Sequence, residues 1–167
     1  MSVITANAAV SRPHPRLDRR RFALLALAAG LIAASPGPQK GLRREGLGIE
    51  THRGIVHFTV DIADTDASRE AGLMWVKALA PDRGMLFDFK TVQPVSFWMK
   101  NTLIPLDMVF IAADGRVVSV AANARPMSEA LVPSGGPILG VLEIAGGRAA
   151  QVGIEPGDRV RARMFHP

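Results

Sequence analysis

The sequence predicts a mainly β domain of the α+β class: a compact β-barrel-like or curled mixed sheet of seven to eight short strands with two short helices. Short segments alternate apolar and polar residues, or are apolar throughout, as strands do. Between them, 16 glycines and 12 prolines in 167 residues supply turns. The chain has no cysteine, so a hydrophobic core must stabilise it without disulfides.

The first half of the domain combines strands with one helix. Residues 55–62 alternate apolar and polar side chains, which predicts a strand with one solvated face. Residues 64–77 predict a helix with Thr65 or Asp66 as its N-cap. Further strands are expected at 85–89, 95–100 and 106–112.

In the second half of the domain, glycine residues mark the turns and the ends of the predicted elements. Asp114-Gly115 between two apolar runs predicts a β-hairpin with a type I′ turn, continued by a strand at 116–120. Residues 138–144 are apolar on both faces and predict a central, covered strand. The remaining elements are a loop at 124–137, a short helix between Gly147 and Gly153, a turn at 155–158 and a last strand at 160–165.

Residues 1–35 predict an export signal. Arginines among residues 12–21 precede an uncharged run at 22–34, which is too short for a bilayer-spanning helix. The segment Arg19-Arg20-Arg21-Phe22 resembles a twin-arginine signal, the alternative being an ordinary secretory signal. We expect export, into the bacterial periplasm, and no permanent membrane span once the signal is removed. Residues 36–46 are then a flexible linker, and 47–167 form one domain.

Charge argues against nucleic acid as a partner. The chain has a formal net charge of +5, but from Pro36 onward 15 Lys and Arg face 14 Asp and Glu, a net of +1. The absence of cysteine excludes thiolate nucleophiles and thiolate metal sites. Methionines near the 97–107 run suggest copper weakly, because methionine also fills cores. We therefore predict no cofactor, no metal and a monomer.

The densest chemical signal is the run from Phe97 to Asp107, which holds two rings, a thioether, an amine, an amide, a hydroxyl and a carboxylate. In an extended segment Phe97 and Trp98 point to opposite faces, so one is expected in the core and the other over a groove. Asp107 either accepts hydrogen bonds from backbone amides of the 101–105 turn or pairs with Glu143 or Lys100.

Glu143 is the most informative single residue, because it lies in an apolar strand. A buried carboxylate without a partner is unfavourable. Lys100 and Arg69 are the leading candidate partners, with Asn101 and Thr102 as neutral donors. Two interpretations stay open: a buried salt bridge that fixes the helix on the sheet, or a cluster that faces a ligand.

Several ordered motifs resemble one known family. These are Arg69-x-x-Gly72-Leu73-Met74, Gly84-Met85-Leu86-Phe87-x-Phe89, the 97–107 run, Val141-Leu142-Glu143-Ile144, and Gly153-Ile154-x-Pro156-Gly157-Asp158. They are similar to the domain of unknown function 192 family over about residues 55–163. The resemblance implies a compact, β-rich, often exported domain with no established activity. Family members often carry an arginine where this chain has Val76.

Three functional hypotheses follow, and the first and third assign no catalytic residue. The first is an exported binding module whose polar and aromatic groove takes a small anionic or polar ligand, a peptide or a glycan. The second is a hydrolase or lyase with Asp107 and Glu143 as its acid–base pair. The third is a structural domain of the cell envelope. The predicted groove residues are Arg69, Trp98, Met99, Lys100, Asn101, Thr102, Asp107 and Glu143.

Overall fold

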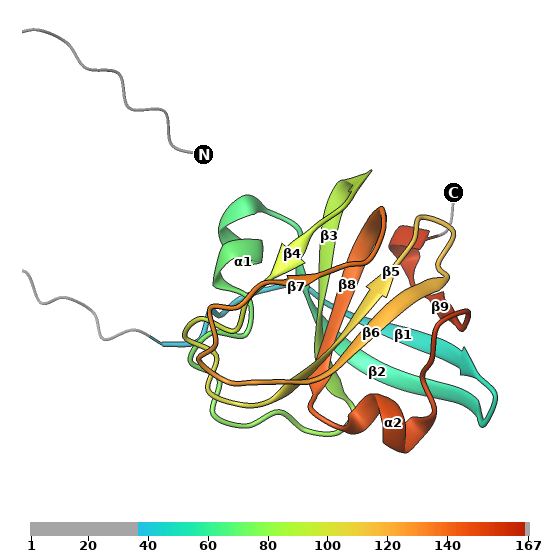
Figure 1. The fold of residues 1–167 in the computed structure, drawn as a ribbon, viewed down its shortest axis with the longest axis horizontal. Helices are drawn as coiled ribbons and strands as arrows, with labels where there is room; N and C mark the ends of the chain where they lie inside the picture. Colours follow the sequence, from blue (N-terminus) through green and yellow to red (C-terminus); the bar gives the residue numbers. More distant parts are fainter. Residues whose placement is uncertain (1–36, 166–167) are drawn as a thin grey trace, which may run out of the picture. The chain divides into compact units, whose positions relative to one another are not determined.

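The computed structural model describes residues 37–165, so the predicted export signal lies outside the described residues. The main sheet comprises β1 (Arg44–Thr51), β2 (Gly54–Ala63), β3 (Arg83–Gln93), β5 (Leu106–Ile111), β6 (Val117–Ala124), β8 (Ile138–Ala145) and β9 (Arg159–Arg161). The other elements are α1 (Asp66–Ala71), β4 (Ser96–Phe97), β7 (Val132–Pro133), α2 (Arg148–Val152) and a 3-10 turn, η1 (Arg163–Phe165). Figure 1 shows their arrangement.

The main sheet has the strand order β6-β5-β8-β3-β2-β1-β9, and β4 pairs with β7 in a separate two-stranded sheet. The β2–β3 pair is parallel, whereas β8 pairs antiparallel with both β3 and β5. This order places β8 in the interior of the sheet, between β5 and β3, as its mostly apolar sequence predicts. The predicted fold class is confirmed.

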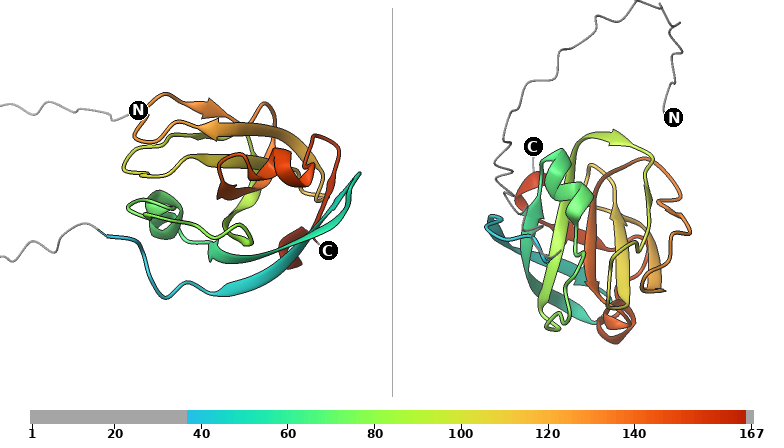
Figure 2. Two further views of the ribbon diagram at one scale, coloured as in Figure 1. Left: turned by 90° about the horizontal axis from the view of Figure 1, so that it is seen from below. Right: turned by 90° about the vertical axis from the view of Figure 1, so that its left-hand side faces the viewer.

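The sheet curls until its two edges meet at one end, which gives a half-barrel (Figure 2). The Val160 amide donates to the Gly115 carbonyl at 2.8 Å, and the Val117 amide donates to the Asp158 carbonyl at 2.9 Å. These bonds join β9 to the start of β6 and satisfy edge groups that would otherwise be unpaired.

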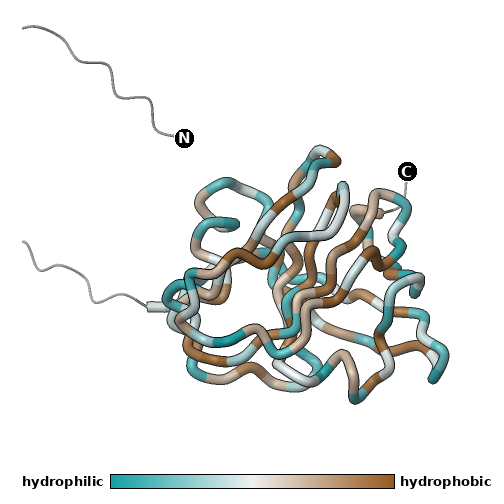
Figure 3. The backbone as a smooth tube through the Cα atoms, viewed as in Figure 1, coloured by the Kyte–Doolittle hydropathy of each residue, from teal (hydrophilic) through white to brown (hydrophobic). Residues whose placement is uncertain are grey.

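The two faces of the sheet support two hydrophobic clusters, because successive side chains in a strand point to opposite sides. Leu142 and Ile144 of β8 belong to one cluster, which also packs against α2, β9 and η1. Val141, from the other face, joins a second cluster with residues of the β4–β7 layer and the turn after α1. Hydrophobic stretches run along β5 and β8 (Figure 3).

The predicted helix at 64–77 is shorter than expected. Thr65 caps α1 as predicted, in a capping box with Ser68, but the helix ends at Ala71. Gly72 has a φ of 46° and Trp75 a φ of 64°, which a continuing right-handed helix does not allow. The Trp75 amide instead donates to the carbonyl of Asn101 at 2.9 Å. A tertiary contact therefore overrides the local helical pattern.

Two predicted strands are also shorter. The strand expected at 95–100 is confined to Ser96–Phe97, and the one expected at 160–165 ends at Arg161 and continues as η1. The Asp114-Gly115 hairpin forms, but not with a type I′ turn, since Gly115 has a positive φ and Asp114 does not.

The predicted linker at 36–46 contains ordered structure. Strand β1, which the sequence does not predict, begins at Arg44. Further upstream, the Gln39 side-chain amide donates to the carbonyls of Ser68 and Gly72 at 3.0 and 2.8 Å. The chain is therefore anchored to the end of α1 before β1 begins.

Across residues 37–165, no helix combines the length and the apolar character that crossing a bilayer requires.

Candidate functional site

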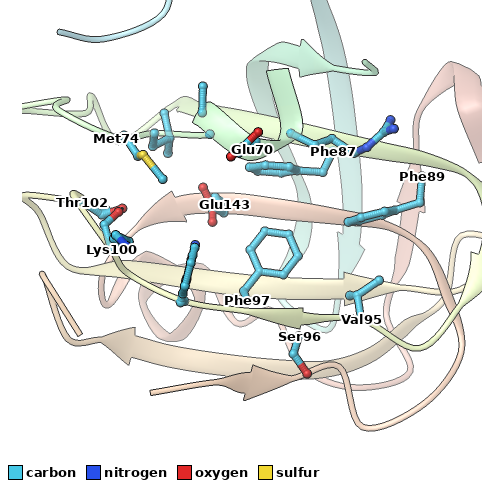
Figure 4. A pocket seen from close by; sticks show the side chains of 15 residues that line it. Glu70, Met74, Phe87, Phe89, Val95, Ser96, Phe97, Lys100, Thr102 and Glu143 are labelled. Carbon is cyan, nitrogen blue, oxygen red and sulfur yellow. The ribbon is translucent and has the colours of Figure 1, made fainter. Parts of the chain in front are cut away.

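A cavity of about 250 Å³ lies between the sheet and the layer that contains α1 and β4 (Figure 4). Side chains reach it from α1 and the turn that follows, from β3, from β4 and the segment just after it, and from β8. These segments are far apart in sequence. The cavity therefore exists because the sheet register and the layer above it bring them together.

Aromatic rings form much of the cavity wall. The half-buried ring of Phe97 packs edge-on against Phe87 and Phe89, with centroid distances of 5.1 and 6.2 Å, and against Phe110 at 6.1 Å. Trp98 also lines the cavity but is 43% exposed. The prediction that one ring packs in the core and the other covers a groove holds only in part, because Phe97 packs against the core but lines the same cavity as Trp98.

Glu143 projects from β8 into this cavity (Figure 4). In the sheet it is paired with Met85 of β3 on one side and Met108 of β5 on the other, and both methionines are buried. Glu143 itself is 4% exposed. Thioethers and rings thus surround a carboxyl group in the middle of a sheet.

Within residues 37–165, the carboxyl group of Glu143 has no ion pair and no hydrogen-bond partner. Every side-chain oxygen or nitrogen in that range that is fully inaccessible to solvent has a hydrogen-bond partner. Because the Glu143 oxygens have none, they must be accessible from the cavity. Burial, which removes the water that stabilises a carboxylate, raises the pKa of Glu143 to about 8. The group is therefore protonated at neutral pH.

The predicted pairing of Lys100 or Arg69 with Glu143 is wrong. Lys100 Nζ lies 5.0 Å from the centroid of the Trp98 ring and 4.0 Å from Oε1 of Glu129. Both partners are more exposed than Glu143, and the ammonium stays near solvent.

Arg69 is held by other groups as well. Its guanidinium pairs with the Asp66 carboxylate and donates to the Asp88 carbonyl at 2.6 Å. It also lies 5.7 Å from the centroid of the Phe89 ring. Arg69 and Lys100 both line the cavity, so they contribute positive charge there without neutralising Glu143.

The predicted acid–base pair of Asp107 and Glu143 is also wrong. In the β5–β8 register Met108 is opposite Glu143 and Asp107 is opposite Ile144. Neighbouring strand residues point to opposite faces, so the two carboxyl groups lie on different sides of the sheet.

Asp107 is fully buried and accepts backbone hydrogen bonds from Asn123, Gly147 and Ala149 at 2.8, 2.9 and 2.8 Å. The prediction of amide partners is confirmed, but they come from β6 and the start of α2 rather than from the 101–105 turn. Asp107 therefore fixes α2 to the sheet.

The remaining predicted residues divide between core and cavity. Met99 is 1% exposed and packs in the second hydrophobic cluster. Asn101, with a φ of 57°, holds the turn after α1 through its carbonyl and through its side-chain amide, which lies 3.7 Å from the sulfur of Met74. Thr102 is buried and lines the cavity. Of the eight predicted residues, the cavity includes Arg69, Trp98, Lys100, Thr102 and Glu143.

Sequence reasoning missed several wall residues, including Phe87, Phe89, Glu70 and Met74. A signal for two of them was present, because Phe87 and Phe89 are two residues apart in a predicted strand and so share a face. Glu70 and Met74 lie beside the end of α1, where the sequence predicts continuing helix.

Of the five non-glycine residues with left-handed backbone in residues 37–165, three lie in segments that adjoin the cavity. Trp75, Asn101 and Met127 have φ values of 64°, 57° and 61°, which are unusual for bulky side chains. Their segments are joined by backbone hydrogen bonds, from Trp75 to Asn101 at 2.9 Å and from Met127 to Thr102 at 3.1 Å. Such conformations persist only where the surroundings enforce them, and they concentrate at functional sites.

In the described part of the chain, no three His, Asp, Glu or Cys side chains gather in a metal-binding group.

The chain belongs to the DUF192 family, "Uncharacterized ACR", whose model matches residues 48–162. This confirms the resemblance seen in the sequence. No curated protein matches the chain.

Solved structures that are similar to this protein include two crystal structures of bacterial proteins. One is of a "putative transcription regulator" from Sinorhizobium meliloti 1021, with 43% identity and a TM-score of 0.72, covering 74% of this chain and 96% of that one. The other is of a protein of unknown function from Novosphingobium aromaticivorans DSM 12444, with 42% identity and a TM-score of 0.73, covering 78% of this chain and 94% of that one.

Proposed function

We propose that this domain is a binding module for a small ligand and that the cavity at Glu143 is its binding site. The observation that carries the proposal is the state of the Glu143 carboxyl group, which is desolvated, without a partner in residues 37–165, and open to the cavity. Leaving a buried polar group unpaired is unfavourable. A ligand with a hydrogen-bonding group would supply the missing partner.

The cavity has the composition of a small-molecule site. Such sites are mostly apolar, with a few polar groups that orient the ligand. Here Phe87, Phe97 and Trp98 offer ring surface, while Glu143 and Thr102 offer polar atoms. The volume of about 250 Å³ favours a small ligand over an extended polymer.

The alternative functions have less support. An acid–base pair of Glu143 with Asp107 is excluded by their opposite faces. A purely structural role leaves Glu143 unsatisfied, in contrast to Asp107 with its three amide donors. Regulation of transcription, which the name of the Sinorhizobium relative suggests, does not fit the net charge of +1 from Pro36 onward.

We further propose that the module acts after export. This part of the proposal comes from residues 1–35, where a basic region, a short apolar run and small residues follow one another as in an export signal. Fusing residues 1–40 to a reporter that is active only in the periplasm tests it. Replacing Arg19 and Arg20, the arginine pair of the motif, by lysine in the same fusion distinguishes twin-arginine export from ordinary secretion.

The binding proposal is tested by titrating the isotope-labelled full chain with a library of small fragments and following backbone amide resonances. We expect a subset of fragments to shift the amides of Phe97, Thr102 and Glu143 together. Glu143→Leu should abolish these shifts, whereas Glu129→Gln, which changes an exposed carboxylate, should preserve them. A library that leaves the cavity amides unshifted would contradict the proposal.

A further inference from the structure

We propose that the ligand is a small carboxylic acid with an apolar body, and that the carboxyl group of Glu143 donates the hydrogen bond that holds it. This inference rests on the proposed function and specifies the chemical class of the ligand. It follows from three features of the cavity: the uncharged carboxyl group of Glu143 at its base, which is called the floor below, the charged side chains around it and the aromatic walls.

The floor of the cavity is a hydrogen-bond donor rather than an anion. Met85 and Met108 flank Glu143 in the sheet, and no cation in the described residues pairs with its carboxyl group. A protonated carboxyl group offers one O–H donor and a carbonyl acceptor. Because desolvation raises the pKa of Glu143 to about 8, the donor is present at neutral pH.

A ligand carboxylate is the acceptor that benefits most from such a donor. Hydrogen bonds of the O–H···O⁻ type are shorter and stronger than those between neutral groups. The two carboxyl groups would share the proton that Glu143 brings. No metal or further reactant is required.

The charged groups around the cavity favour an anion over a cation. Arg69 and Glu70 reach it from α1, and Lys100 reaches it from the segment between β4 and β5. Within the described residues, β3 and β5 add no titratable side chain to the lining. Two cations and one exposed carboxylate therefore line the cavity, while Asp66 and Glu129, which lie beside the two cations, are outside the lining. A cationic ligand would also have to ionise Glu143.

The walls determine the rest of the ligand. Phe87 and Phe97 meet edge to face beside Glu143, and Trp98 presents a partly exposed ring at the same cavity. Rings and short branched chains pack well on such surfaces. The ligand class is therefore an aryl or branched aliphatic monocarboxylate.

A matched set of three probes tests the class: phenylacetate, phenylacetamide and 2-phenylethylamine, which differ in the polar group. Their dissociation constants for the full chain are measured by calorimetry at pH 6 and pH 9. We expect phenylacetate to bind more tightly than the amine at pH 6. We also expect its affinity to fall about tenfold at pH 9, because roughly nine tenths of Glu143 loses its proton when the pKa is about 8.

Two variants assign this pH dependence to Glu143. Glu143→Gln keeps the shape and an N–H donor, so it should bind phenylacetate equally at pH 6 and pH 9. Glu143→Leu removes the donor and should lose phenylacetate at both pH values. The matched control is Glu129→Gln, which alters an exposed carboxylate outside the cavity lining and should leave the pH dependence of the wild type intact. Thermal unfolding checks that each variant is folded.

Three outcomes would overturn the inference. If 2-phenylethylamine bound more tightly than phenylacetate at pH 9, Glu143 would act as an anionic partner for a cationic ligand. Phenylacetate binding that neither pH nor Glu143→Gln changes would assign the carboxylate to Arg69 or Lys100. Binding of none of the three probes would reject this ligand class, whereas the fragment titration separately decides whether the cavity binds ligands at all.

Discussion

Asp107 and Glu143 are both acidic, both buried and located on neighbouring strands, yet the protein treats them differently. Asp107 faces the cluster that contains α2 and accepts three backbone hydrogen bonds of 2.8 to 2.9 Å. Glu143 faces the aromatic cavity and has no partner in residues 37–165. Burial alone therefore does not indicate function, whereas burial without a partner and with access to a cavity does.

The surroundings of Asp107 and Glu143 also differ in which charge state of the carboxyl group they stabilise. The amides around Asp107 stabilise its carboxylate, and they belong to elements that the carboxylate holds in place. Around Glu143 the methionines and rings favour the neutral acid. Predictions that separate the two sites follow, from the largest expected effect to the smallest.

The largest effect is a loss of stability with rising pH that depends on Glu143. The unfolded chain releases this proton near pH 4.5, but the folded protein retains it until about pH 8. The folded state thus binds more protons in this window, so the free energy of unfolding falls by several kcal/mol as pH rises from 4.5 to 8. Urea unfolding at pH 5 and pH 9 measures this fall.

Glu143→Gln is the matched comparison for the pH effect, since glutamine has no proton to lose. Its free energy of unfolding should change much less between pH 5 and pH 9, so at pH 9 the variant should be more stable than the wild type. Equal pH dependence in both proteins would show that Glu143 is ionised in the folded state at pH 5 and would remove the distinction from Asp107.

Asp107→Ala should destabilise the protein by about 3 kcal/mol, because three buried amides lose a charged acceptor. Asp107→Asn, which keeps one acceptor oxygen, should lose less. Both values come from urea unfolding at pH 7. A loss below about 1 kcal/mol for Asp107→Ala would mean that water replaces the carboxylate and that Asp107 does not hold α2.

Lys100→Met should change the free energy of unfolding by less than about 1 kcal/mol. The lysine side chain is 43% exposed, and its nearest carboxylate, Glu129, is 4.0 Å away and 66% exposed. Exposed pairs of this kind contribute little. Severe destabilisation would instead favour the buried salt bridge with Glu143 that the sequence also permits. The 97–107 run would then stabilise the fold rather than form a binding site.

Local sequence signals account for much of the fold. Alternation predicts β2, an apolar run predicts β8, and Thr65 and Gly153 mark where α1 begins and α2 ends. The sequence alone also places Glu143 in an apolar strand and predicts that one ring of the Phe97–Trp98 pair covers a groove, whereas in the structure both rings line the cavity. These features depend on neighbours in the chain.

The errors concern contacts between distant segments. The register of β5 on β8 decides that Asp107 and Glu143 face opposite sides, and no local pattern fixes that register. Trp75 leaves the helical conformation because its amide bonds to Asn101, 26 positions later in the sequence. Arg69 finds Asp66 one helical turn away, which satisfies it without Glu143.

The most direct test of the central claim is the pKa of Glu143 itself, measured from the pH dependence of its side-chain carboxyl ¹³C resonance in the full chain. Glu143→Gln identifies the resonance by its disappearance. An unpartnered, desolvated carboxyl group predicts a midpoint of about 8. A midpoint at or below the ordinary value of 4.5 would show that a cation or several donors neutralise Glu143, and would contradict the account of this cavity as a binding site with a neutral acid at its floor.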